Sequence, residues 1–162
     1  MVIENLEGRI IDYKKSIEIV IEKKILWNTK TKYLLLKVLN KITGNYDIGW
    51  RVQELNWIST NEAINITFDS FPTELMSKTN KIPEYQFIKG AALVFSQAYN
   101  GDIYILILFP IIENISIEKS SIDLGVYNPT KISEELIVEK VDEFLKQMIE
   151  WELPSIKNKL GY

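Results

Sequence analysis

The stretch GAALVFSQAYNGDIYILILFP, residues 90–110, decides the fold, because two apolar runs meet in it at Asn100-Gly101. Asn-Gly between strand-like runs is the strongest short-range signal for a β-hairpin, since both central residues of a type I′ turn need a positive φ. A two-residue turn at this position pairs Tyr99 with Asp102 and Ala98 with Ile103. The resulting hairpin has two apolar faces, one with Leu93, Phe95, Tyr104, Leu106 and Leu108, the other with Ala92, Val94, Ala98, Ile103, Ile105, Ile107 and Phe109.

A hairpin that is apolar on both faces must be covered on both faces. A membrane helix needs about 20 apolar residues, whereas the run IYILILFPII ends at Glu113 and contains Pro110. We therefore expect no membrane span and a second strand that is central in its sheet. Amphipathic helices at the two ends of the chain supply one cover. The other cover is a further helix, a curled part of the sheet, or a second subunit.

The N-terminal segment predicts a long amphipathic helix. Its apolar residues repeat at steps of three and four, interrupted by Lys24: Ile3, Leu6, Ile10, Tyr13, Ile17, Val20 and Trp27. Such a repeat forms one apolar stripe on a helix. Additional isoleucines at positions 11, 19, 21 and 25 widen this stripe. The wider stripe favours packing in a globular core over an isolated two-stranded coiled coil.

The segment WNTKTK, residues 27–32, is polar and weakly helical, so it predicts a break in this helix. Asn28 or Thr29 would cap a second helix through YLLLKVLNKI, and Gly44 would end it in the left-handed conformation. This interpretation gives two antiparallel N-terminal helices. The alternative is one helix over residues 3–43, because the heptad phase continues through Thr31, Leu34 and Val38.

The remaining segments alternate in the manner of strands until the last helix. AINITF follows WRVQELNW, whose large residues change parity, which predicts a β-bulge near Gln53-Glu54 or a strand that crosses between two packing environments. Residues 70–84 form a long connection with a short turn after Pro72, and an edge strand is expected at residues 122–127. The last helix begins at Asn128-Pro129 or Ser133 and stops at Pro154.

These elements predict a single α+β domain over residues 1–162. Its mainly antiparallel sheet has about five strands, with the hairpin of residues 90–110 at its centre. Two N-terminal helices and one long C-terminal helix pack on the sheet. Composition agrees with a compact globular protein, because 46% of the residues are hydrophobic and 25% are charged.

Several chemistries are excluded by residue types that the sequence lacks. The chain contains no cysteine and no histidine, so disulfides, thiolate nucleophiles, Ser-His-Asp triads and histidine metal sites are impossible. It has no G-x-G-x-x-G and no P-loop. No signal peptide is visible at the N-terminus, and we expect a cytoplasmic protein. The sequence nominates no catalytic residue, metal ligand or cofactor.

Charge is distributed unevenly, although the net charge is only −3. Residues 1–45 carry nine basic and five acidic side chains, whereas residues 113–153 carry four and ten. The basic end would suit nucleic acid, but the chain has only two arginines, the residue that gives bidentate phosphate contacts. We expect no nucleic-acid partner, and explain the basic end by a solvated surface or by complementarity to the acidic C-terminal helix.

Contact residues for a partner or ligand are expected in two places. The polar face of the first hairpin contributes Arg51, Gln53, Asn65, Thr67 and Asp69, and the N-terminal helices contribute Trp27 and Tyr33. Trp50 and Trp57 suit a core or an interface. The pairs Glu134-Glu135, Asp142-Glu143 and Glu150/Glu152 are interpreted as a solvated helix face.

The resulting hypothesis is a non-catalytic interaction protein that self-associates or binds another protein. It would do so through the second face of its sheet or through its N-terminal helices. One alternative is a metal-dependent phosphodiesterase or nuclease that uses Asp, Glu and Lys, which would require convergent carboxylates beside a lysine. Another is a carrier with a small-ligand cavity between sheet and helices.

Overall fold

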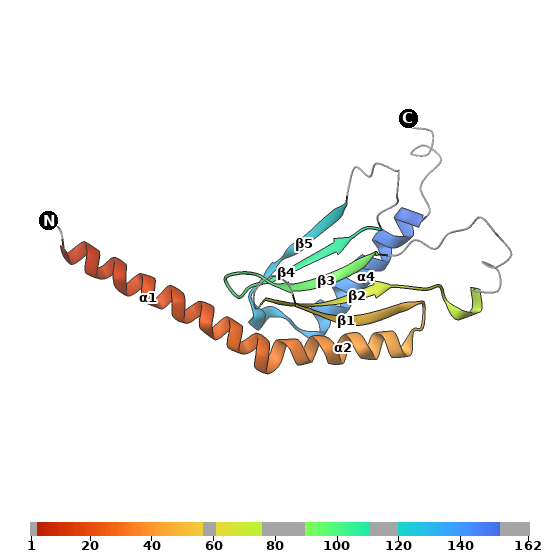
Figure 1. Ribbon diagram of the computed structural model, residues 1–162, viewed down its shortest axis with the longest axis horizontal. Coiled ribbons are helices and arrows are strands. Elements are labelled where there is room, and N and C mark those ends of the chain that lie inside the picture. The colour runs from red at the N-terminus through yellow and green to blue at the C-terminus, as the bar shows by residue number, and fades with distance from the viewer. Residues whose placement is uncertain (1–2, 57–60, 76–89, 111–119, 153–162) are drawn as a thin grey trace, which may run out of the picture.

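A computed structural model describes residues 3–56, 61–75, 90–110 and 120–152 of the chain. It has an α+β fold in which a long N-terminal helical rod and a C-terminal helix accompany one antiparallel sheet (Figure 1). The rod contains α1 (Ile3–Leu26), the π-helical turn η1 (Trp27–Thr31) and α2 (Lys32–Asn45). The sheet strands are β1 (Trp50–Asn56), β2 (Glu62–Phe68), β3 (Ala92–Gln97), β4 (Ile103–Leu108) and β5 (Ser121–Tyr127), and the last helix is α4 (Glu134–Glu152).

The N-terminal rod is one helix, so the prediction of two antiparallel helices was wrong and its alternative is confirmed. The polar segment after Leu26 widens the helix into a π turn, and the backbone N–H of Lys32 donates to the carbonyl of Trp27. Trp27 and Thr31 are both buried in this turn, so tertiary packing overrides their weak helix propensity. The rod ends at Asn45, and Gly44 does not take the predicted left-handed conformation.

The five strands pair in chain order, β1-β2-β3-β4-β5, and all four pairings are antiparallel. One face of the sheet lies against α2 and α4 and forms the main core with them; α4 passes behind the sheet in Figure 1. The core side chains of β3 and β4 come from alternate positions: Leu93, Phe95, Ile103, Ile105 and Ile107. The predicted central hairpin of an antiparallel sheet is therefore confirmed.

The register of that hairpin differs by one residue from the predicted one. Gln97 pairs with Ile103 and Phe95 with Ile105, so the loop has three residues beyond the pair Ala98–Asp102. Gly101 donates its N–H to the carbonyl of Ala98 (3.0 Å) and has φ +87°, as in a type I turn followed by a G1 bulge. The predicted type I′ turn was wrong, because Asn-Gly suits both turn types.

This shift exchanges the faces of β4, since side chains alternate along a strand. Its isoleucines Ile103, Ile105 and Ile107 join the face of Leu93 and Phe95, and all five are buried in the core. Tyr104, Leu106 and Leu108 lie on the other face with Ala92 and Val94. The predicted composition of the two faces was therefore wrong, and the second face carries smaller and half-buried apolar residues.

The large residues of β1 change from one face of the sheet to the other because they pack in two different environments, and not because the strand contains a bulge. The register of β1 with β2 is continuous from Trp50↔Phe68 to Asn56↔Glu62. Trp50 is buried in the main core, whereas Leu55 packs on the second face of the sheet. The irregular register of the sheet lies instead between β4 and β5, near Tyr104 and Leu106. Trp57, at the end of the same segment, lies outside the described residues.

The C-terminal helix follows the sequence prediction closely. Asn128 caps the short turn Pro129–Lys131, and the Oγ atom of Ser133 accepts a hydrogen bond from the N–H of Leu136 (3.1 Å). The buried stripe of α4 is Ile137, Val141, Phe144 and Met148. The short turn expected after Pro72 is the 3₁₀ turn Thr73–Leu75, and Pro154 lies outside the described residues.

Candidate protein interface

The most exposed apolar surface of the described chain is the helix α1. Every residue from Ile3 to Ile19 is exposed and α1 buries none of its residues, so the predicted packing of this helix in a globular core was wrong. Figure 1 shows why, since α1 projects beyond the end of the sheet. We call its 3,4-spaced residues the seam; their exposed fractions include 41% for Ile17 and 65% for Tyr13. The seam consists of Ile3, Leu6, Ile10, Tyr13, Ile17 and Val20.

The same stripe is buried where the rod reaches the sheet. Trp27, Leu35 and Leu39 are fully buried in the main core, and Thr31 and Val38 are almost fully buried. These positions continue the apolar side of the rod through the π turn, whose wider spacing keeps residues 27, 31 and 35 directed to the core. The rod therefore carries one apolar side, of which the second half has a packing partner and the first half has none among the described residues.

The hairpin between β3 and β4 fixes the direction in which α1 leaves the domain. Lys23 forms an ion pair with Asp102 (Nζ to Oδ1, 2.8 Å), and both side chains are less than one-fifth exposed. Gly101 lies so close to the helix that a Cβ at this position would be 2.6 Å from the Cβ of Lys23. The Nζ atom of Lys24 lies 5.8 Å from the ring centroid of Tyr99. These contacts hold the last turn of α1 and leave the preceding turns free.

A second group of contacts holds the rod at the π turn. The Nζ atom of Lys32 lies 2.9 Å from the Oε2 atom of Glu62, to which the Nε1 atom of Trp27 also donates (3.4 Å). The hydrogen bond from Lys32 lowers the pKa of Glu62 below 4.5 and burial opposes this shift. The same hydrogen bond raises the pKa of Lys32 above 10.5. Trp27 is therefore a core residue that satisfies its N–H inside the fold, with no side-chain surface exposed to a partner.

The five sheet residues nominated from the sequence do lie on one face, as neighbours in the first hairpin. Arg51 is opposite Thr67 and Gln53 is opposite Asn65, while the Nε atom of Arg51 lies 2.6 Å from the Oδ2 atom of Asp69. With its amide oxygen toward Arg51, Gln53 accepts from both terminal guanidinium nitrogens (2.8 and 3.1 Å) and donates to Asn65 (3.2 Å). Most of these polar groups thus bond to one another, and Thr67 donates to the carbonyl of Ala91 (2.8 Å).

This polar row borders the apolar second face of the sheet. Asn65 and Thr67 are buried, whereas the side chains of Arg51 and Asp69 are about half exposed. Next to them lies a small apolar cluster in which every described member comes from a strand: Leu55, Ala63, Ala92, Val94, Leu106 and Leu108. This face of the sheet consequently has a polar part on β1 and β2 and an apolar part that extends from Leu55 and Ala63 of the same two strands to β3 and β4.

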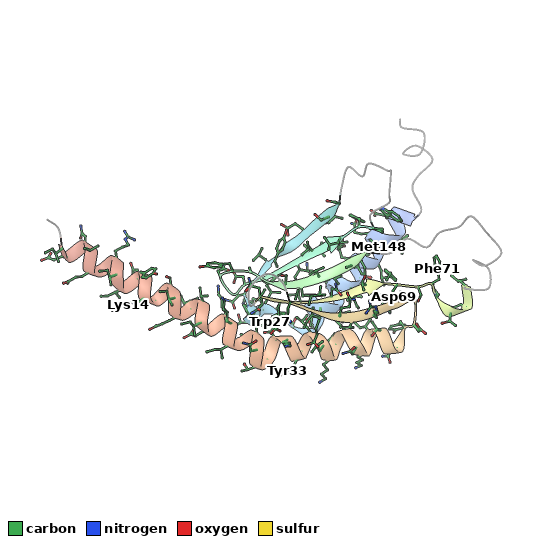
Figure 2. All side chains as sticks on the ribbon, in the orientation of Figure 1. Lys14, Trp27, Tyr33, Asp69, Phe71 and Met148 are labelled. Atoms are coloured by element: carbon green, nitrogen blue, oxygen red, sulfur yellow. The ribbon has the colours of Figure 1, made fainter. Side chains whose placement is uncertain are left out.

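Tyr33 and the acidic last helix lie apart from this face. Tyr33 is on the rod, and its side chain is 61% exposed (Figure 2). In the described part of the chain, the rod lysines that form ion pairs do so with Asp102, Glu54 and Glu62, not with the acidic last helix. Asp142 pairs instead with Lys146 of its own helix (3.2 Å).

The described residues form neither a metal-binding cluster nor a membrane-spanning helix. Within residues 3–56, 61–75, 90–110 and 120–152, no three Asp or Glu side chains gather as metal ligands would. In the same ranges, no helix combines the length and the apolar character that crossing a bilayer requires.

Sequence reasoning identified the seam but not the residues that direct it. Lys23 and Asp102 are 79 positions apart, and no local pattern links them. The available signal was the turn at Asn100-Gly101, which places Asp102 beside a hairpin tip. Comparison with known proteins adds no assignment, since no family model, curated protein or solved structure matches this chain.

Proposed function

We propose that this protein is a non-catalytic interaction module that self-associates, and that α1 pairs with the same helix of a second copy. The observation that carries this proposal is the contrast along the rod: the stripe that is buried in α2 is exposed in α1. Fully burying a large apolar side chain contributes roughly 1.5 to 3 kcal/mol relative to leaving it in water. Five of the six seam residues are exposed and Val20 is half-buried, so the seam represents a substantial unused driving force.

A helix is the partner that suits this surface. The seam runs from Ile3 to Val20 with the spacing at which two helices interlock side chains, and it spans roughly 26 Å at 1.5 Å per residue. A second copy presents the identical stripe, so pairing removes the exposed surface of both chains at once. Charged residues flank the stripe on both sides, including Glu7, Arg9 and Lys14, which suits a solvated rim.

The proposal is tested by light scattering after size-exclusion chromatography of the full chain. We expect the wild-type mass to be that of two chains, and the double variant Ile10→Glu/Ile17→Glu to have the mass of one. The matched control is Ile11→Glu/Ile19→Glu, which places the same charges on exposed isoleucines of the same helix but outside the seam. The control should remain a dimer. A wild-type protein that is monomeric at all tested concentrations would contradict self-association.

A further inference from the structure

We infer that the two α1 helices pair antiparallel, in the register that places Ile3 against Val20, Leu6 against Ile17 and Ile10 against Tyr13 of the second copy. This inference rests on the proposed function and specifies its geometry. The apolar residues of a coiled-coil stripe alternate between two positions, a and d. In antiparallel coiled coils an a residue of one helix faces a d residue of the other. The seam satisfies this condition completely, because each of its six residues finds a partner in the one register.

The charge distribution along α1 favours this orientation. The first half of the helix, residues 3–14, has a net charge of −1 and the second half, residues 15–26, has a net charge of +1. The ten charged residues are Glu4, Glu7, Arg9, Asp12, Lys14, Lys15, Glu18, Glu22, Lys23 and Lys24. Antiparallel helices place each acidic half beside the basic half of the other copy. Parallel helices place acidic beside acidic and basic beside basic, so electrostatics opposes that arrangement.

The charged residues that flank the seam also favour the antiparallel orientation. In the antiparallel register, Glu7 of each chain lies beside Lys14 of the second copy, which makes two attractive pairs. In a parallel pair with equal register, Arg9 would lie beside Lys14 of the second copy, and the two Lys24 side chains would meet in the seam. Flanking charges of this kind set the orientation of paired helices.

The shape of the molecule excludes the parallel arrangement independently. Beyond Val20 the apolar side of the rod turns into the domain, where Trp27 and Thr31 are buried and Lys23 contacts the hairpin. A parallel partner that followed the seam would continue into the space that the sheet of this chain occupies. An antiparallel partner reaches the hairpin only with its first helical turn and then runs away from the domain (Figure 1). The pair is thus a rod with one sheet at each end, separated by the overlap of the two helices.

Disulfide cross-linking between single-cysteine variants tests this register, because the natural chain contains no cysteine. Leu6→Cys is mixed with ¹⁵N-labelled Ile17→Cys, and the masses of the oxidised products are measured. Both positions are exposed, so each variant should retain the wild-type circular dichroism spectrum. We expect a linked dimer of intermediate mass in the mixture and almost no linked dimer from either variant alone, since Leu6 and Ile17 each lie far from their own copies. The control mixture Gly8→Cys with Lys15→Cys occupies equivalent levels on the outer side of the helix and should not cross-link.

The possible results separate the inference from the proposed function. Efficient linkage of Leu6→Cys to itself would show parallel helices and overturn the antiparallel register, while self-association would stand. A dimer by light scattering in which the Leu6→Cys and Ile17→Cys mixture cross-links no better than the Gly8→Cys and Lys15→Cys mixture would overturn it as well. A monomeric mass for both unoxidised variants and the wild type would overturn the register together with the proposed function.

Discussion

The two halves of the N-terminal rod carry the same kind of stripe and have opposite environments. In α2 the stripe is closed off by the sheet and α4, so Leu35 and Leu39 are fully buried. In α1 the stripe extends past the end of the sheet, and Ile10 and Ile17 remain exposed. Periodicity therefore defines which side of a helix is apolar, but the length of the sheet determines how much of that side the domain can cover.

The largest expected effect distinguishes the two halves by their contribution to stability. Replacing fully buried Leu35 by alanine should lower the free energy of unfolding by about 2 to 5 kcal/mol, because it removes packed methyl groups and leaves a cavity. Replacing Leu6, which is 55% exposed, should change it by about 0.5 kcal/mol or less in dilute, dissociated protein. Urea unfolding followed by tryptophan fluorescence measures both values. Equal losses for the two variants would mean that α1 packs on its own domain.

A smaller loss of stability is expected at Gly101, beside the point where the rod passes from its exposed half to its buried half. Gly101 has φ +87°, and an added Cβ would collide with the Cβ of Lys23. Alanine at this position should cost about 1 to 2 kcal/mol for the left-handed backbone, with a further loss from displacement of α1. Gly90→Ala is the matched control, because Gly90 has φ +103° but no atom of the described residues lies within 4 Å of an added Cβ.

The measurements for this pair are urea unfolding and amide hydrogen exchange of residues 20–26. Both variants should lose stability, but only Gly101→Ala should increase exchange at the end of α1, since only Gly101 touches the helix. Identical exchange in the two variants would show that the close approach of hairpin and helix does not hold α1 in place.

The sequence predicted element types well, because strand alternation and helical spacing are local properties. The sheet, its central hairpin and the buried stripe of α4 from Ile137 to Met148 all followed from such patterns. The continuous rod did not follow, since the burial of Trp27 and Thr31 depends on distant strands. The hairpin register also did not follow, because Asn100-Gly101 fits two turn types that differ by one residue.

The candidate interface could be predicted only in part, because burial depends on segments that are distant in the sequence. The seam of α1 was recognisable from its spacing, and the polar neighbours Arg51, Gln53 and Asn65 were correctly placed on one face. Whether the seam is buried depends on where the sheet ends, which no local pattern specifies. Trp27 was expected on the apolar stripe and as a contact residue, but a tryptophan beside a polar segment gives no sign of the distant strands that bury it completely.

The smallest expected effect concerns pH and the contacts that begin the buried half of the rod. Lys32 donates a hydrogen bond to Glu62, which lowers the pKa of this carboxylate below its ordinary 4.5. The stabilising contribution of the Glu62 carboxylate is therefore fully present above pH 4.5 and is lost as pH falls through the lowered pKa. The pKa of Lys32 is raised, so the stabilising contribution of its ammonium group is present at lower pH. That contribution is lost only as pH rises through a value above 10.5.

Glu62→Gln should thus be less stable than the wild type at pH 7, and the difference should shrink as urea unfolding is repeated toward pH 3. Other carboxylates titrate in both proteins, so the difference isolates the Lys32–Glu62 pair. Glu54→Gln is the control, because Glu54 lies 3.8 Å from Lys32 with a side chain that is 57% exposed, which predicts a smaller difference at pH 7. A difference between wild type and Glu62→Gln that stays constant from pH 7 to pH 3 would mean that the shape of the Glu62 side chain, and not its charge, holds the rod against the sheet.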